Sequence, residues 1–238
     1  MASPIVRTNV AAIMSQSAGV TNFTQAALAE AAGWAQDDIC ILLVAVGVSG
    51  VTWTPTGFAT IANTSAAGSS FWAGWARRGA SALTYTIAWS AGSSYTEGLL
   101  FAVSGCPTSG SPIDVQATSG TSTRTPGNVD CPSITTLGAD RLVIACGAAG
   151  AASAAGGWTA PSGYSILANL TAVAQPAIAA AYKALVSAGA KDPAAFANAN
   201  TGASDVHELS FALLPVGGAS SVSYPCPPRN PMQPLLVR

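Results

Sequence analysis

The chain has 238 residues, of which 50% are hydrophobic and only 8% are charged, against about 25% charged residues in ordinary soluble domains. Its nine basic and ten acidic residues give a formal net charge of −1, and no basic run could neutralise a phosphate backbone, so we expect no nucleic-acid partner. The longest apolar run, residues 39–46, has the length of a strand and is too short to span a membrane, so we expect no membrane partner.

Residues 1–19 are mixed in composition, and we predict that they form an arm or an added strand. They lack a basic segment followed by an apolar stretch, so we expect no secretory signal.

Four segments follow one another between residues 37 and 103. An acid-led apolar run occupies residues 37–47, and a Trp-Thr-Pro-Thr-Gly-Phe turn region opens residues 53–63. Residues 71–77 close on an aromatic and a base, and residues 98–103 form a last apolar strand. Short β-branched or aromatic segments separated by Gly, Pro, Ser and Thr are typical of an antiparallel sandwich. The run at 39–46 is apolar on both faces and should lie centrally in its sheet.

The same four segments recur in the same order at residues 139–147, 158–169, 177–183 and 208–213, with Asp38 aligned to Asp140. The Pro-Ser/Thr-Gly-aromatic turn is the clearest shared feature. The second copy of the third segment is rich in Ala, the best helix former, but its partner contains Phe71, Trp72 and Trp75, which favour a strand. We therefore predict an all-β fold, an antiparallel β-sandwich made of two homologous repeats.

The predicted organisation is an N-terminal arm at residues 1–19, sandwich repeats at 20–106 and 107–216, and a Pro-rich C-terminal arm at 217–238. Five prolines lie between positions 225 and 238, which excludes helix and favours an extended conformer. Such a segment has little to bury by itself, so we expect it to lie across a neighbouring subunit.

The repeat resembles a group of tandem, jelly-roll-like β-sandwich proteins found mainly in phage and prophage structural clusters. The resemblance covers roughly residues 20–216 and rests on the four segments above, the last of which ends near Phe101-Ala-Val-Ser-Gly or Phe211-Ala-Leu-Leu-Pro. It implies a virion building block, assembled in the host cytoplasm and carried on the external surface of the particle. Host lysis would release such a protein without a signal.

Within that resemblance we expect a capsid decoration or cement protein, a homo-oligomer that contacts the major capsid protein or other virion proteins. A collar, tail or head-fibre component is the alternative within the particle. A carbohydrate-binding module that contacts a host glycan is an alternative of another class.

Catalytic and metal-binding patterns are weak, and we predict a protein that is not an enzyme and holds no cofactor or metal. His207 has no Gly-x-Ser-x-Gly motif to accompany it, and we interpret it as a surface or strand-edge residue. Asp37 and Asp38 are adjacent, and a turn-forming role explains them and Asp140. A calcium site made by Asp37, Asp38 and loop carbonyls is the alternative.

The five cysteines contain no Cys-x-x-Cys spacing. Cys40 and Cys146 lie inside apolar strands and are predicted to be small buried hydrophobes. Cys226 lies in the Pro-rich tail, where it is either a free thiol or forms an intermolecular disulfide.

Partner contacts are predicted in two places. Trp53 and Trp158 occupy corresponding loop positions and are the tryptophans best suited to an exposed role, either stacking on a sugar or packing in an interface. The second place is the tail, whose predicted contact residues are Tyr224, Cys226, Pro227, Pro228, Arg229, Leu235 and Leu236.

Overall fold

The structure is a computed structural model that describes residues 2–15, 19–93, 95–124, 128–150, 157–170, 177–185, 187–198 and 204–217. Within these ranges the protein is all-β and its strands pair antiparallel, which confirms the all-β, antiparallel part of the predicted fold class. In the same ranges, no helix is long and apolar enough to cross a membrane.

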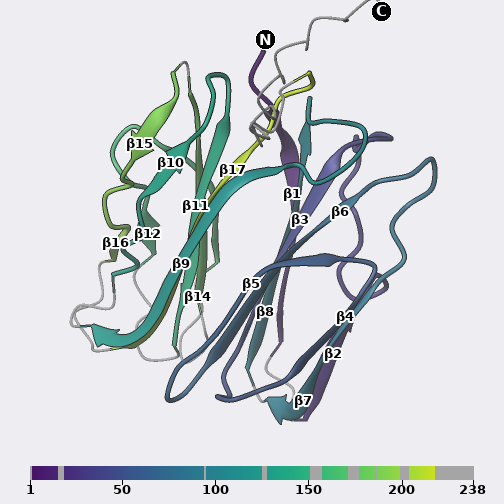
Figure 1. The fold of residues 1–238 in the computed structure, drawn as a ribbon. Coiled ribbons are helices and arrows are strands. Elements are labelled where there is room, and N and C mark those ends of the chain that lie inside the picture. The colour runs from purple at the N-terminus through teal and green to yellow at the C-terminus, as the bar shows by residue number, and fades with distance from the viewer. Residues whose placement is uncertain are drawn as a thin grey trace, which may run out of the picture.

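Two groups of strands lie side by side, the first running from purple through blue to the teal of β7 and β8, and the second from the teal of β9 to yellow (Figure 1). The first group contains β1 (Ile5–Ser15), β2 (Val20–Thr24), β3 (Ile39–Val46), β4 (Trp53–Thr56), β5 (Ala59–Ser65), β6 (Ser70–Arg77), β7 (Thr86–Ser93) and β8 (Thr96–Ser104). The second contains β9 (Ile113–Arg124), β10 (Ile134–Thr136), β11 (Leu142–Ala149), β12 (Trp158–Thr159), β13 (Ser165–Leu170), β14 (Ala177–Ala184), β15 (Gly189–Lys191), β16 (Ala197–Asn198) and β17 (Ser204–Leu213).

Each half contains a five-stranded sheet, and the two sheets have the same connectivity. The first has the order β1-β8-β3-β6-β5, and the second, written from the corresponding edge, has the order β9-β17-β11-β14-β13. Each half also has an outer layer, which is the three-stranded sheet β2-β7-β4 in the first half and the two-stranded pairs β10-β15 and β12-β16 in the second. The residues predicted as an N-terminal arm or added strand include β1, which pairs along β8 as an edge strand.

The register of the sheets defines which residues of the two halves are equivalent. Ile39 at the start of β3 pairs with Val103 of β8, and Leu142 at the start of β11 pairs with Leu213 of β17. Residues counted from these pairs along matching strands occupy equivalent places in the two halves.

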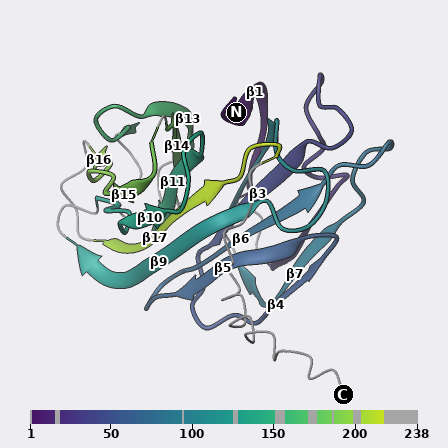
Figure 2. The same cartoon turned by 45° about the horizontal axis from the view of Figure 1, so that its top comes forward.

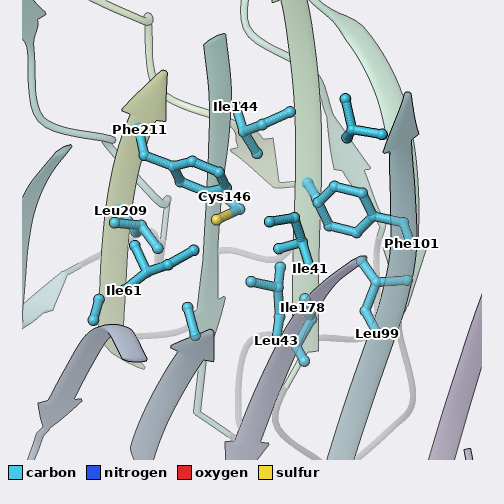
Figure 3. Close-up of a cluster of buried hydrophobic side chains, with 14 of the residues drawn as sticks. Ile41, Leu43, Ile61, Leu99, Phe101, Ile144, Cys146, Ile178, Leu209 and Phe211 are labelled. Atoms are coloured by element: carbon cyan, nitrogen blue, oxygen red, sulfur yellow. The ribbon is translucent and has the colours of Figure 1, made fainter. Parts of the chain in front are cut away.

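A central core lies between the two five-stranded sheets and draws side chains from both halves. In Figure 3, Leu99 and Phe101 of β8 lie on one side of this core and Leu209 and Phe211 of β17 on the other. All four side chains are fully buried. Since burial of one such side chain stabilises a fold by about 1.5–3 kcal/mol, this core couples the two halves into one body.

The five-stranded sheets are buried on both faces, which explains the continuous apolar runs. In β3, Ile41 and Leu43 face the central core, whereas Leu42 and Val44 pack against the outer layer of the first half. The prediction that residues 39–46 form a central strand is confirmed, because β3 lies between β8 and β6. The Ala-rich strand β14 is likewise a strand and not a helix, as the comparison of the repeats predicted.

We expect Phe211→Ala in the second half to lower the unfolding temperature of both halves together. A truncation of this size in a core costs about 3–5 kcal/mol. Five of the six tryptophans belong to the first half, so tryptophan fluorescence reports mainly on that half. A single transition, shifted down in fluorescence and in far-ultraviolet circular dichroism alike, is the expected result. A fluorescence transition that stays at the wild-type temperature would show that the halves unfold independently.

Candidate functional site

The two predicted contact tryptophans lie in strands and pack inward. Trp53 of β4 is half-buried, with ring centroids 6.4 Å from Trp72 and 5.7 Å from Trp89. Trp158 of β12 is only 5% exposed and meets Phe196 edge to face at 6.4 Å. The expectation of an exposed ring is therefore wrong for Trp158, because strands β4 and β12 belong to the outer layers and turn these side chains toward the cores.

An open depression follows Trp158 along the surface. It has a volume of about 560 Å³ and is lined by Trp158, residues 159–163, Tyr164 and Ile166. Lys183 places its Nζ 5.5 Å from the centroid of the Tyr164 ring, and Ile166 is 46% exposed. Burial raises the pKa of the Tyr164 phenol to about 12, so its hydroxyl keeps its proton at neutral pH. The depression offers an aromatic wall and an apolar side chain to a ligand.

His207 lies in the interior and not at the surface or at a strand edge, which corrects the sequence interpretation. It is 0% exposed, in a strand flanked by β11 and β9. Its Nδ1 lies 2.8 Å from Thr64 Oγ1, its Nε2 lies 2.9 Å from Ser69 Oγ, and its ring stacks on Phe71. All three partners belong to the first half, so this imidazole joins the two halves.

The environment keeps the His207 imidazole neutral. Burial lowers its pKa to about 4, with a small opposing effect from the charge of Asp205. A neutral ring has one donor and one acceptor nitrogen, and the two hydroxyl groups can satisfy both. The local sequence gave no signal for this role, because the partners lie more than one hundred positions away along the chain.

Glu97 occupies the place in β8 that His207 occupies in β17. Glu97 pairs with Ala45 in β3, and His207 pairs with Ala148 in β11. Glu97 also reaches into the other half, where its Oε2 accepts a hydrogen bond of 3.0 Å from the backbone N–H of Ile178. Burial raises the pKa of this carboxyl to about 8, although the hydrogen bond opposes the shift. Sequence reasoning missed Glu97. The signal that could have found it is an acidic residue next to the apolar run of β8.

The acidic residues before β3 are engaged in the fold. Asp37 has a φ of 67° and its equivalent Asp140 has a φ of 58°, a left-handed conformation that Asp tolerates better than most residues. The turn-forming role is thereby confirmed for these two, and the register aligns Asp140 with Asp37 and not with Asp38. Asp38 instead forms an ion pair with Arg7 and accepts the N–H of Ala35. Within the described ranges no cluster of three His, Cys, Asp or Glu residues could hold a metal ion.

Three exposed apolar residues gather at one end of the molecule, which we call the terminal face: Ile5, Leu137 and Val216. Ile5 pairs with Ser104, and the N–H of Val216 donates a hydrogen bond to the carbonyl of Gly105, which follows Ser104 in the chain. Leu137 donates its N–H to the Asp114 carboxylate near the start of β9. Their exposed fractions are 65%, 57% and 55% in chain order. Sequence reasoning missed this face because it is assembled from three separate loops and strand ends.

The described fold begins and ends at the terminal face. Figure 2 turns this end forward and shows the N-terminus between β14 and β3, in agreement with the bond of Ser3 Oγ to the carbonyl of Leu185. The last described residue, Gly217, follows Val216 directly. The predicted tail contacts at Tyr224, Cys226, Pro227, Pro228, Arg229, Leu235 and Leu236 lie outside the described residues. Cys40 and Cys146 are fully buried free thiols, as predicted.

We expect the Glu97→Gln variant to gain thermal stability relative to wild type at pH 8 and to gain less at pH 5. The folded state holds a proton on Glu97 up to a pH of about 8, whereas the unfolded chain releases it near pH 4.5. The stability that Glu97 contributes is therefore complete below pH 4.5 and is lost as the pH rises to 8. The unfolding temperatures of wild type and Glu97→Gln at the two pH values test this. The control is Asp192→Asn, which removes the charge of an exposed acidic residue. An equal effect of Glu97→Gln at both pH values would contradict it.

Comparison with protein-family models, curated proteins and solved structures finds no match to this chain.

Proposed function

We propose that this chain is a non-catalytic structural protein of a bacteriophage virion that decorates and stabilises the assembled capsid from the outside. The observation that carries the proposal is the terminal face. Ile5, Leu137 and Val216 expose apolar side chains where the described fold begins and ends. A contact that covers these side chains would remove their apolar surface from water, which favours docking at this end.

The sandwich acts in this proposal as a rigid body, and the terminal residues act as clamps on capsid subunits. The Pro-rich residues from Tyr224 to Arg238 then extend the contact from the terminal face across a neighbouring subunit. A protein that binds only the assembled shell shifts the equilibrium toward that shell by RT ln(1 + [L]/Kd). Assembly in the host cytoplasm and a homo-oligomeric arrangement on the external surface follow from this role.

We further infer that the two halves are homologous copies of one jelly-roll-like sandwich. The order of the five strands in the two main sheets supports this inference. So do two irregularities of register at equivalent places, between Thr60 and Ala62 in β5 and between Ile166 and Ala168 in β13. Bulges are individual features of a strand, and their recurrence is not required by sandwich packing.

Two alternative functions would use some of the same structural features. A collar, tail or head-fibre component would use the same rigid body and terminal face at another place in the particle. A carbohydrate-binding module would use the depression beside Tyr164, where an aromatic wall and polar loop groups lie together.

The terminal face can be tested with purified capsid shells that lack this chain. The combined variant Ile5→Ser, Leu137→Ser and Val216→Ser should bind shells more than about tenfold more weakly than wild type, because each side chain loses apolar burial in the contact. Ala67→Ser, an exposed change in the β5–β6 turn at the other end, serves as the control. Wild-type affinity of the triple variant at an unchanged unfolding temperature would reject the terminal face as the docking site.

Cryo-electron microscopy of particles from the source phage distinguishes the roles within the virion. A regular lattice of this chain over the shell is the expected density. Density confined to the neck, tail or fibres would replace decoration by the second role, and absence from the particle would reject the virion proposal.

A glycan array distinguishes a carbohydrate-binding module from a decoration protein. A signal that is lost in Tyr164→Ala and kept in the terminal-face variant would favour a carbohydrate-binding role over decoration. Decoration predicts no glycan signal.

A further inference from the structure

Each half contains an ion pair between its first strand and the residue before its central strand. In the first half, Arg7 of β1 bonds to Asp38 through Nε at 3.0 Å and Nη2 at 2.9 Å. In the second half, Arg141 bonds through Nε to Asp114 of β9 at 3.0 Å. The first strand therefore carries the cation in one half and the anion in the other.

The two ion pairs occupy equivalent places. Asp38 and Arg141 each come directly before the first residue of their central strand. Arg7 follows Val6 in a register shift that spans residues 7–9 of β1, and Asp114 is the single residue at a register shift in β9. Val6 pairs with Val103 of β8, and Ile113, the residue before Asp114, pairs with Leu213 of β17. Val103 and Leu213 occupy equivalent places in the two sheets.

The surroundings of the two pairs match as well. The carboxylate of Asp38 accepts the N–H of Ala35 at 2.7 Å, and that of Asp114 accepts the N–H of Leu137 at 3.2 Å. Each carboxylate thus also holds the loop that precedes its central strand. The carboxylates of Asp38 and Asp114 are 3% and 1% exposed and the Arg141 side chain is 4% exposed, whereas the Arg7 side chain is 35% exposed.

We propose that the opposite polarity of these two ion pairs assigns β1 and β9 each to its own sheet. If β1 paired in the place of β9, Arg7 would face Arg141. If β9 paired in the place of β1, Asp114 would face Asp38. Each error places a like charge against a buried side chain, Arg141 in the first case and Asp38 in the second, and such contacts are unfavourable.

The opposite ion pairs would prevent a folding error that this architecture permits. Two sheets of the same connectivity in one chain can exchange corresponding strands, and misassembly between like units is a characteristic failure of repeat proteins. β1 and β9 are edge strands, so each is held by a single neighbour, β8 or β17. Backbone pairing alone does not distinguish the two places, whereas the sign of a buried charge does. This inference is independent of any role in a virion.

The test keeps both ion pairs and removes their opposition, at the cost of the hydrogen bond from the Ala35 N–H to Asp38, which its control variant also lacks. The double variant Arg7→Asp and Asp38→Arg gives the first half the polarity of the second. After refolding from urea, we expect its recovery in the native size-exclusion peak to fall by roughly twofold or more, with misassembled species in its place. The native fraction should melt close to wild type, because the pair is retained.

The control is the quadruple variant, which adds Asp114→Arg and Arg141→Asp. It carries every local disturbance of the double variant and more, yet the two pairs are again opposite. Recovery should return to the wild-type level. Full recovery of the double variant, or a quadruple variant that refolds as poorly as the double, would overturn the proposal.

Discussion

The packing of two five-stranded sheets against each other is the constraint on which the rest of this molecule depends. One face of each sheet meets the other sheet and the opposite face meets an outer layer, so β3 and β11 carry apolar residues on both faces. The close approach of neighbouring strands within one sheet adds a second constraint. A Cβ on Gly147 would lie 2.1 Å from the carbonyl oxygen of His207 on the neighbouring strand, so no other residue fits there without a shift. Few charged residues are compatible with so much buried sheet, which gives a physical reason for the low charge content.

Much of the fold could be predicted from local pattern, because strand period, turn residues and the recurrence of segments are local properties. The recurrence of segments also overrides helix propensity. Ala177–Ala184 favours a helix by composition, yet it forms a strand, as the equivalent segment Ser70–Arg77 does. The site could not be predicted in the same way. The sequence predicts His207 at the surface or at a strand edge, because it lies at a strand start and no catalytic motif accompanies it. Its hydroxyl partners, Thr64 and Ser69, come from the other half, and only the three-dimensional packing brings them together.

The two halves keep the same frame but use different outer layers. Trp75 and its equivalent Tyr182 both pack against the central core, so this position retains a large aromatic side chain. Trp72 instead faces the outer layer, where it packs with Trp53 and Phe58, and its equivalent is Ala179. The first half thereby holds a continuous three-stranded outer sheet on an aromatic cluster. The second half holds two short strand pairs over small side chains, and the open depression lies beside one of them.

The contacts between the halves follow an approximate twofold relation, and this relation limits where the protein can bind a partner. Glu97 of β8 reaches the start of β14, and His207 of β17 reaches the equivalent start of β6, where Phe71 lies. An interface in which equivalent residues reach equivalent places is the kind that identical subunits form. Since this face of each five-stranded sheet is used within the chain, it is not available to other molecules. Attachment to a larger assembly must use the outer layers, the sheet edges or the ends, and among the described residues the exposed apolar side chains of Ile5, Leu137 and Val216 lie at one end.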